Sequence, residues 1–347
     1  MLILAGPTGG GDEHHGGPHH PERPARIGAV MAGVEDLRLG EELVTLEAPP
    51  APVDDLARVH RLPYLDEMES FCARGGGDLD PDTYARPGSW EAARRAAGAG
   101  LAAAAALRAH GDGVGLVVAR PPGHHAEADR AMGFCLLNNV AVTAASLTAV
   151  GERVLIVDWD VHHGNGTQSI FWDDPRVLYV STHQWPLFPG TGRAVEVGGV
   201  TALGLTVNVP LPAGATGDVV RQAVDHVAGP VVDRFAPDWV LVSCGFDAHR
   251  DDPLGELALS SGDFARLATD VAGYAPGPGR VLLFLEGGYD LAALRTSTAA
   301  TLGALLGGGD RPEEPTSGGP GGDQVRATAL RRDRAVHVAG ESAPMDL

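Results

Sequence analysis

The chain has 347 residues and a formal net charge of −19, and all 26 of its basic residues are arginine. The lack of lysine excludes Schiff-base and P-loop lysine chemistry from within the chain, and the acidic balance argues against direct nucleic-acid binding. The N-terminal apolar run ends at Ala5, and no run approaches the ~18 residues of a membrane span, so we expect a cytoplasmic protein with no membrane contact.

Apolar strands alternate with helices along most of the chain. We predict helices over 22–36, 54–59, 63–73, 89–110, 139–150, 216–235, 263–274 and 291–306, and strands over 115–119, 154–157, 177–183, 203–209, 239–243 and 280–285. This alternation predicts an α/β fold around a parallel sheet. The length allows two domains or one large one.

The remaining segments are loops and a tail. Residues 1–20 are rich in Gly and carry His14, His15, His19 and His20 without regular spacing, which favours a flexible rim loop over a metal site. We expect residues 75–88 to form a surface loop. We expect a catalytic domain over 1–306, a flexible Gly/Pro-rich segment over 307–321, and a helix and tail over 322–347.

Three cysteines, Cys72, Cys135 and Cys244, share no CxxC spacing. Cysteines in such a pattern are typical of free thiols in a reducing compartment.

Polar side chains stand just past the ends of four predicted strands, where ligand sites of α/β sheets form. They are Asp158, Asp160 and His162 after the 154–157 run, His124 and His125 after 115–119, Asp247 after 239–243, and Tyr289 after 280–285. Since these clusters span the chain from 124 to 289, one domain with one composite site explains them better than two domains.

This set of side chains is suited to metal-assisted hydrolysis. Asp160, His162 and Asp247 offer three N and O ligands, which leaves the fourth position of a tetrahedral zinc open for water. A nearby neutral histidine can take the proton of that water, and a tyrosine can donate to an oxyanion, so the assembly can hydrolyse an amide. The alternative is that these groups are polar residues satisfied within a loop or on the surface.

Six motifs in order resemble the zinc-dependent histone deacetylase and acetylpolyamine amidohydrolase family. They are RPPGHHA (120–126), GFCLLNN (133–139), VDWDVHHGNGTQ (157–168), FPGTG (188–192), SCGFDAHRDDPLG (243–255) and LEGGYDL (285–291), with HHPERPARI before them. The resemblance covers most of residues 19–305. It implies the arginase/deacetylase fold, a single three-layer α/β/α domain with a mainly parallel sheet, and amidohydrolase activity on acetyl-lysine-type substrates.

Position by position, the resemblance implies roles for the strand-end groups. It assigns Asp160, His162 and Asp247 to one catalytic Zn²⁺, His125 to the general base, and Tyr289 to polarisation of the acetyl carbonyl.

The resemblance also implies partners for the base. His124 should be its electrostatic neighbour, paired with Asp158. Asn165 stands where one branch of the family has an Asp; this Asn is similar to the class II branch and should leave His125 less basic than a carboxylate would.

The substrate and structural-ion sites follow from the same resemblance. Phe134 and Phe188 match two aromatics that wall the acyl tunnel, and Gly133, Leu254 and Gly288 match substrate-site positions. A structural monovalent-cation site, expected to hold K⁺, would use Asp158, Ser181 and the backbone of Asp160 and His162, and a second would fall near 171–177.

Three departures bear on the substrate. Tyr289 replaces the His of class IIa relatives and argues for full activity, whereas Leu254 replaces the acidic gatekeeper of polyamine-selective relatives and makes an acetylpolyamine a less favoured substrate. The short loop before the 89–110 helix leaves open whether Gly88 or Ser89 contacts the substrate backbone.

Two other kinds of protein share these features in part. A binuclear manganese ureohydrolase needs extra bridging carboxylates where this chain has Gly164 and Gly245. An inactive acyl-lysine binding module would keep the fold without turnover.

Acetylated lysine peptides, acetylpolyamines, other N-acyl amines and longer acyl groups remain open as substrates. The composition suggests a bacterial, high-GC source, and relatives of this kind often form dimers or tetramers.

Overall fold

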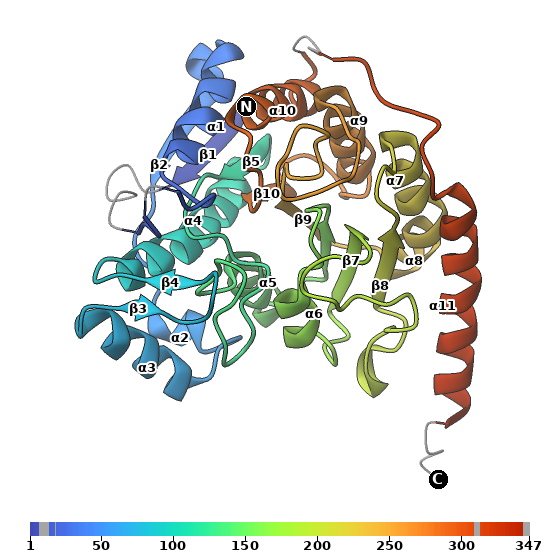
Figure 1. The fold of residues 1–347 in the computed structure, drawn as a ribbon, viewed down its shortest axis with the longest axis horizontal. Coiled ribbons are helices and arrows are strands. Elements are labelled where there is room, and N and C mark those ends of the chain that lie inside the picture. Colours follow the sequence, from blue (N-terminus) through green and yellow to red (C-terminus); the bar gives the residue numbers. More distant parts are fainter. Residues whose placement is uncertain (7–13, 18, 309–312, 343–347) are drawn as a thin grey trace.

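A single parallel sheet forms the centre of the computed structural model, which describes residues 1–6, 14–17, 19–308 and 313–342 (Figure 1). Every neighbouring pair of its strands is parallel. In spatial order the strands are β2 (Leu43–Glu47), β1 (Leu2–Gly6), β5 (Val114–Val117), β10 (Val281–Leu285), β9 (Trp239–Cys244), β6 (Val154–Asp158), β7 (Val177–Gln184) and β8 (Thr206–Leu211).

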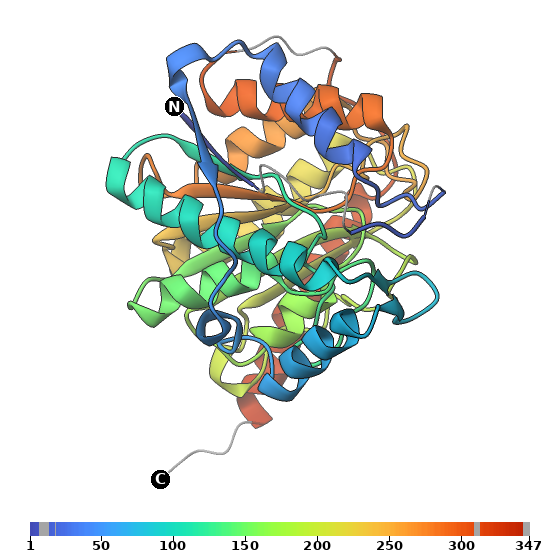
Figure 2. The same ribbon diagram turned by 90° about the vertical axis from the view of Figure 1, so that its left-hand side faces the viewer.

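Helices cover both faces of this sheet (Figure 2). One layer contains α1 (Ala25–Asp36), α7 (Gly217–Ala223), α8 (Gly229–Phe235), α9 (Ser261–Ala272) and α10 (Leu291–Leu305). The other contains α2 (Val53–Leu56), α3 (Leu62–Ala73), α4 (Ser89–His110) and α5 (Asn139–Ala149). Helix α11 (Gly322–Ser342) lies along β8 at one edge of the sheet (Figure 1). The predicted three-layer α/β/α arrangement is confirmed.

Alternating side chains along each strand build the two cores. Leu155 and Val157 pack into the cluster formed with α1 and α7–α10, whereas Val154 and Ile156 pack into the cluster formed with α2–α5. Successive residues of a strand point to opposite faces, and a parallel sheet covered on both faces needs apolar residues throughout. The continuous apolar runs in the sequence therefore mark the central strands correctly.

The structure adds elements that the sequence patterns did not predict. Strands β1 and β2 extend the sheet at one edge, and helix α6 (Asn165–Ile170) begins directly after the 159–164 loop. A short antiparallel pair, β3 (Gly77–Asp78) and β4 (Tyr84–Ala85), lies inside the predicted surface loop. Two 3₁₀ turns, η2 (Gly40–Glu42) and η3 (Val200–Ala202), are also present, and the predicted 216–235 helix is interrupted by a π-helical turn, η4 (Val224–Ala228), between α7 and α8.

The segment after α10 is held to the body of the protein where it is described. Glu313 accepts hydrogen bonds from the Ser261 amide at 2.8 Å and contacts His249 Nε2 at 3.0 Å. The Thr316 amide donates to Asp263 at 2.9 Å. Residues 309–312 of the predicted flexible segment lie outside the described residues, and its flexibility stays a prediction. None of the helices in the described ranges is long and apolar enough to span a membrane.

Candidate active site

The carboxyl ends of β6 and β9 bring three candidate metal ligands together. Ligand atoms of Asp160, His162 and Asp247 all lie within 4.8 Å of one another. Asp160 and Asp247 are fully buried, and the His162 side chain is 12% exposed. Strands β6 and β9 are parallel neighbours, so the loops that follow them lie side by side. This is why His162 and Asp247 meet here although they are far apart in the chain.

Backbone amides fix the two carboxylates. Asp160 Oδ2 accepts from the Gly287 amide at 2.8 Å, and Asp247 Oδ1 accepts from the Val161 amide at 2.9 Å. Asp247 Oδ2 has no hydrogen bond within the described residues and lies 3.3 Å from His162 Nδ1. Burial and the charge of Asp160 raise the pKa of Asp247 to about 7. A cation between these groups would relieve that repulsion, so the donor set fits a metal ion.

Two glycines leave no room for further carboxylates. A Cβ atom at Gly245 would lie 2.1 Å from Asp160 Oδ2, and one at Gly164 would lie 2.2 Å from Asp158 Oδ2. Any side chain at either position would collide with a group of the site. The bridging ligands of a binuclear cluster therefore cannot be accommodated, which argues against the ureohydrolase alternative.

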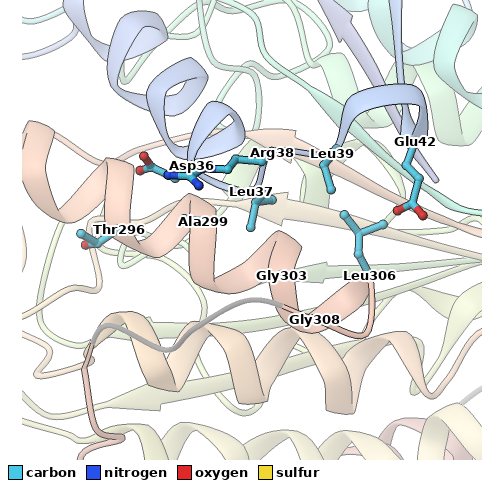
Figure 3. A pocket seen from close by; sticks show the side chains of 10 residues that line it. All are labelled: Asp36, Leu37, Arg38, Leu39, Glu42, Thr296, Ala299, Gly303, Leu306 and Gly308. Carbon is cyan, nitrogen blue, oxygen red and sulfur yellow. The ribbon is translucent and has the colours of Figure 1, made fainter.

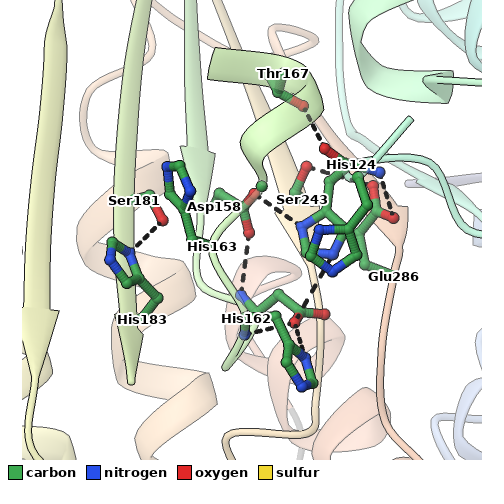
Figure 4. A network of polar contacts seen from close by, with 12 residues as sticks. His124, Asp158, His162, His163, Thr167, Ser181, His183, Ser243 and Glu286 are labelled. Carbon is green, nitrogen blue, oxygen red and sulfur yellow. Dashed lines mark hydrogen bonds and ion pairs between the residues drawn. The ribbon is translucent and has the colours of Figure 1, made fainter. Parts of the chain in front are cut away.

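His124 lies between two buried carboxylates (Figure 4). Its Nδ1 is 3.0 Å from Asp158 Oδ2, and its backbone amide donates to Glu286 Oε2 at 3.1 Å. Burial by itself lowers the pKa of His124, but Asp158, Asp160 and Glu286 together raise it to about 10. His124 is therefore held as a cation.

His125 faces a neutral partner. Its Nδ1 lies 2.8 Å from Asn165 Oδ1, while Asn165 Nδ2 donates to Glu127 Oε1 at 2.9 Å. Because the amide nitrogen is occupied by a carboxylate, the amide oxygen faces the imidazole and accepts its Nδ1 proton. Burial and the neighbouring histidines hold the pKa of His125 well below its usual value. The free lone pair is consequently on Nε2.

The other histidine of this loop, His163, serves the scaffold. It is buried, and its ring nitrogens lie 2.8 Å from Thr191 Oγ1 and 3.0 Å from Gln168 Oε1. Burial lowers its pKa to about 4. Both ring nitrogens of His163 thus have partners within the protein, and His163 is a structural residue, as the alternative of a locally satisfied polar group predicts.

A cavity of about 250 Å³ leads to these groups. Phe134 and Phe188 line it, and the Phe188 ring lies edge-on to His125 with centroids 5.0 Å apart. A Cβ at Gly133 would lie 2.4 Å from His125 Cδ2 and 3.0 Å from Phe188, so only glycine leaves the passage open. The other residues that line the cavity are Asp82, Pro122, His124, His162, Leu187, Leu254, Gly287 and Tyr289.

Tyr289 lines this cavity, and hydrogen bonds with Asp252 and Arg26 hold its loop in place. Asp252 Oδ2 accepts from the amides of Tyr289 at 2.6 Å and Asp290 at 3.2 Å, and its other oxygen accepts from Leu254 at 3.0 Å. On the far side, Arg26 Nε donates to the Gly288 carbonyl at 2.6 Å. Burial keeps the pKa of the Tyr289 hydroxyl well above its usual value, so the phenol stays protonated.

The structure changes three details of the predicted site. Gly287 lines the cavity in place of Gly288, whose carbonyl is turned to Arg26. Ser89 is fully buried and contacts His14 Nδ1 at 2.7 Å, so it cannot be the rim contact. His14 is also buried, at 1% exposure, so it does not belong to a flexible rim loop.

Asp82 is a rim residue that the sequence patterns missed. The turn before it is closed by Asp80 Oδ1, which accepts from the Thr83 amide at 2.6 Å, and Thr83 Oγ1 accepts from the Phe134 amide at 3.1 Å. These bonds tie the 80–83 turn to the cavity wall and place Asp82 at the mouth. The sequence Asp-Pro-Asp-Thr predicts such a turn, but it does not show which part of the protein the turn packs against.

The proposed monovalent-cation residues are also close together. Asp158 and Ser181 are paired across β6 and β7, and Ser181 Oγ contacts His183 Nδ1 at 2.9 Å (Figure 4). The three cysteines are free, as predicted, and all three are buried. A larger cavity of about 780 Å³ lies elsewhere, between α1, η2 and α10, and none of the candidate site residues line it (Figure 3).

Comparison with known proteins agrees with this geometry. The histone deacetylase domain matches residues 20–305. The chain belongs to the histone deacetylase family. It is 39% identical to a probable deacetylase of Archaeoglobus fulgidus, over 85% of this chain and 84% of that protein, and 37% identical to a histone deacetylase-like amidohydrolase of Pseudomonas aeruginosa, over 87% and 80%.

A solved structure of a histone deacetylase is similar throughout. The crystal structure of the HDA15 HD domain superimposes with a TM-score of 0.85 at 34% identity and covers 97% of both chains. This match confirms the arginase/deacetylase fold, and the family relationship makes the chain a deacetylase-type amidohydrolase.

Proposed function

We propose that the chain is a zinc-dependent hydrolase that removes acetyl groups from lysine side chains by direct attack of water. The observation that carries this proposal is the cluster of Asp160, His162 and Asp247 ligand atoms, whose His162 lines the same aromatic-walled cavity as His125, with the two imidazole centroids 6.0 Å apart. Three N and O ligands with an open position suit catalytic zinc. When bound, zinc would acidify water and polarise the substrate carbonyl.

His125 is suited to act as general base. Its Nδ1 proton is held by Asn165, so Nε2 can take a proton from water as the oxygen attacks the acyl carbon. The same nitrogen can return that proton to the departing amine when the C–N bond breaks. The His124 cation behind it favours the negative charge that develops on the acyl oxygen.

Tyr289 supplies a second stabilising group. Its protonated hydroxyl can donate to the oxygen of the tetrahedral intermediate, and Asp252 and Arg26 hold its loop in place. The phenol carries no competing charge, so the donor is available throughout the reaction.

The walls of the cavity favour an acetylated lysine. Phe134 and Phe188 can flank the apolar methylenes of a lysine side chain, and Asp82 at the mouth can accept hydrogen bonds from substrate amides. Leu254 gives no carboxylate at the wall for the second ammonium of a polyamine. An acetylpolyamine or another small N-acyl amine is the alternative substrate. We also propose structural K⁺ beside Asp158.

Turnover of three substrates tests the proposal. The zinc-loaded protein should hydrolyse a fluorogenic acetyl-lysine peptide faster than acetylspermidine or acetylputrescine, and a hydroxamate should block the reaction. Preference for the polyamines would keep the mechanism and contradict the argument from Leu254. Binding of the peptide without hydrolysis, in protein that holds zinc, would favour an acyl-lysine binding module.

A further inference from the structure

A second polar cavity, of about 550 Å³, lies at the ends of the strands opposite to those that carry the catalytic groups. It is lined by Arg153, which precedes β6, by Leu205, which precedes β8, and by Phe235, the last residue of α8. Because all the strands of the sheet are parallel, the cavity lies at their amino-terminal ends. Helix α11 closes the cavity and runs along β8 (Figure 1). The chemistry proposed above does not involve this place.

Positive charge gathers in this cavity, although the chain as a whole is strongly acidic. Three arginines line it, Arg153, Arg234 and Arg332, against one aspartate, Asp333. Arg153 is already engaged, since it donates to the Phe235 carbonyl at 2.7 Å and its Nε lies 3.7 Å from Asp238 Oδ2, so the free positive charge is that of Arg234 and Arg332. Arg234 is exposed and forms no hydrogen bond or ion pair within the described residues. The cavity therefore has a surplus of cationic groups.

Arg332 is the second arginine with unused donors. It is 5% exposed, and within the described part of the chain its one hydrogen bond goes from Nη2 to the Gly204 carbonyl. Its Nε has no acceptor, and Asp333 approaches Nη1 only to 3.6 Å. A guanidinium has five N–H donors, and buried donors are nearly always paired with protein, water or an ion. Burial and the charge of Arg234 lower the pKa of Arg332, against the effect of Asp333. A bound oxyanion would accept hydrogen bonds from the unpaired donors of Arg332 and would balance the positive charge of Arg332 and Arg234.

The walls of the cavity indicate what the rest of the ligand looks like. Leu203, Leu205, Phe235 and Val336 line it beside the arginines. We propose that this cavity binds a small organic oxyanion, a phosphate ester or a carboxylate, with its head group against Arg234 and Arg332 and a short apolar body against these side chains. Since Arg332 and Val336 belong to α11, the ligand would also fasten this helix to the sheet.

Calorimetric titration of the full chain with butyl phosphate tests the proposal. At fixed ionic strength in chloride, wild type should bind about one equivalent and should bind butyl phosphate more tightly than inorganic phosphate. Arg234→Ala removes an exposed side chain and should weaken binding at least about tenfold, as loss of a charged hydrogen bond does. Arg331→Ala, on the same helix but outside the cavity, is the matched control and should bind like wild type.

Each alternative result has a definite meaning. Hexanoate in place of butyl phosphate distinguishes a carboxylate site from a phosphate site, and binding of either supports the proposal. Lack of binding of both anions to wild type overturns it. Equal affinity in Arg234→Ala and Arg331→Ala also overturns it, because the anion would then sit elsewhere. Inorganic phosphate that binds as tightly as butyl phosphate contradicts the apolar part of the site.

Discussion

Glu22 is the centre of a buried charge cluster behind the catalytic loop, and replacing it with Gln should be costly. Its carboxylate contacts Arg120 through both oxygens, with the Nη2 contact at 2.7 Å, and lies 3.4 Å from Arg26 Nη1. All three side chains are fully buried. Burial alone would raise the pKa of Glu22, but the hydrogen bonds and charge of Arg120, with His14 and Arg26, lower it to about 2.

The size of the effect follows from that pKa. The difference from the ordinary value of 4.5 corresponds to about 3 kcal/mol of folding free energy. This agrees with the ~3–5 kcal/mol that is lost when one partner of a buried ion pair is removed. Because the folded-state pKa is depressed, the contribution is fully present above pH 4.5 and is lost as pH falls towards 2.

Urea unfolding of wild type and Glu22→Gln measures this contribution. At pH 7 the variant should lose about 3 kcal/mol in free energy of unfolding, and the loss should shrink steadily below pH 4.5. The control is Asp129→Asn, which breaks an exposed pair with Arg61 and should cost less than about 1 kcal/mol. A loss in Glu22→Gln no larger than in the control, or one that stays constant down to pH 3, would refute the reasoning.

Three further substitutions probe the cavity. Tyr289→Phe should lower kcat by about 10²–10³-fold with zinc content unchanged, as for loss of an oxyanion donor, and near-normal turnover would contradict that role. Gly133→Ala places a Cβ 2.4 Å from His125 and should lower kcat/KM by at least about tenfold, whereas Gly28→Ala, which meets open space, should not. Asp252→Ala removes the acceptor of the Tyr289 amide and should lower kcat by about 10–100-fold with little change in KM. The control is Asp251→Ala, which changes the exposed neighbouring residue. Equal effects of the two substitutions would show that Asp252 has no special part in placing the Tyr289 loop.

Much of the fold could be predicted because apolar runs and helical spacing are local signals. The runs at 154–157 and 239–243 were correctly predicted as buried strands with polar residues at their carboxyl ends, and the structure shows that these two strands are neighbours. Strand β1 was missed because five apolar residues at the start of a chain carry no periodicity, and β2 because half-exposed edge residues give a weak alternation.

The parts of the site that were missed depend on contacts between distant residues. Arg26 reaches the Gly288 carbonyl across 262 positions of the chain, and Asp252 reaches the Tyr289 amide across 37. Nothing in the local sequence around Asp82 shows that its turn packs against Phe134. Side chains that react follow strand ends and could be found, and the resemblance supplied Asp158 and Asn165 as partners of the two histidines. The roles of Arg26, Asp252 and Asp82 were assigned by neither and required the tertiary structure.

Zinc content and turnover, measured together, test the central claim most directly. Wild type should contain about one zinc per chain, lose hydrolysis of an acetyl-lysine peptide on chelation, and regain it when zinc is restored. Asp247→Asn should hold little zinc and show little turnover, while remaining folded by circular dichroism. Full turnover after complete removal of metal, or two metal ions per active chain, would contradict a mononuclear zinc site formed by Asp160, His162 and Asp247.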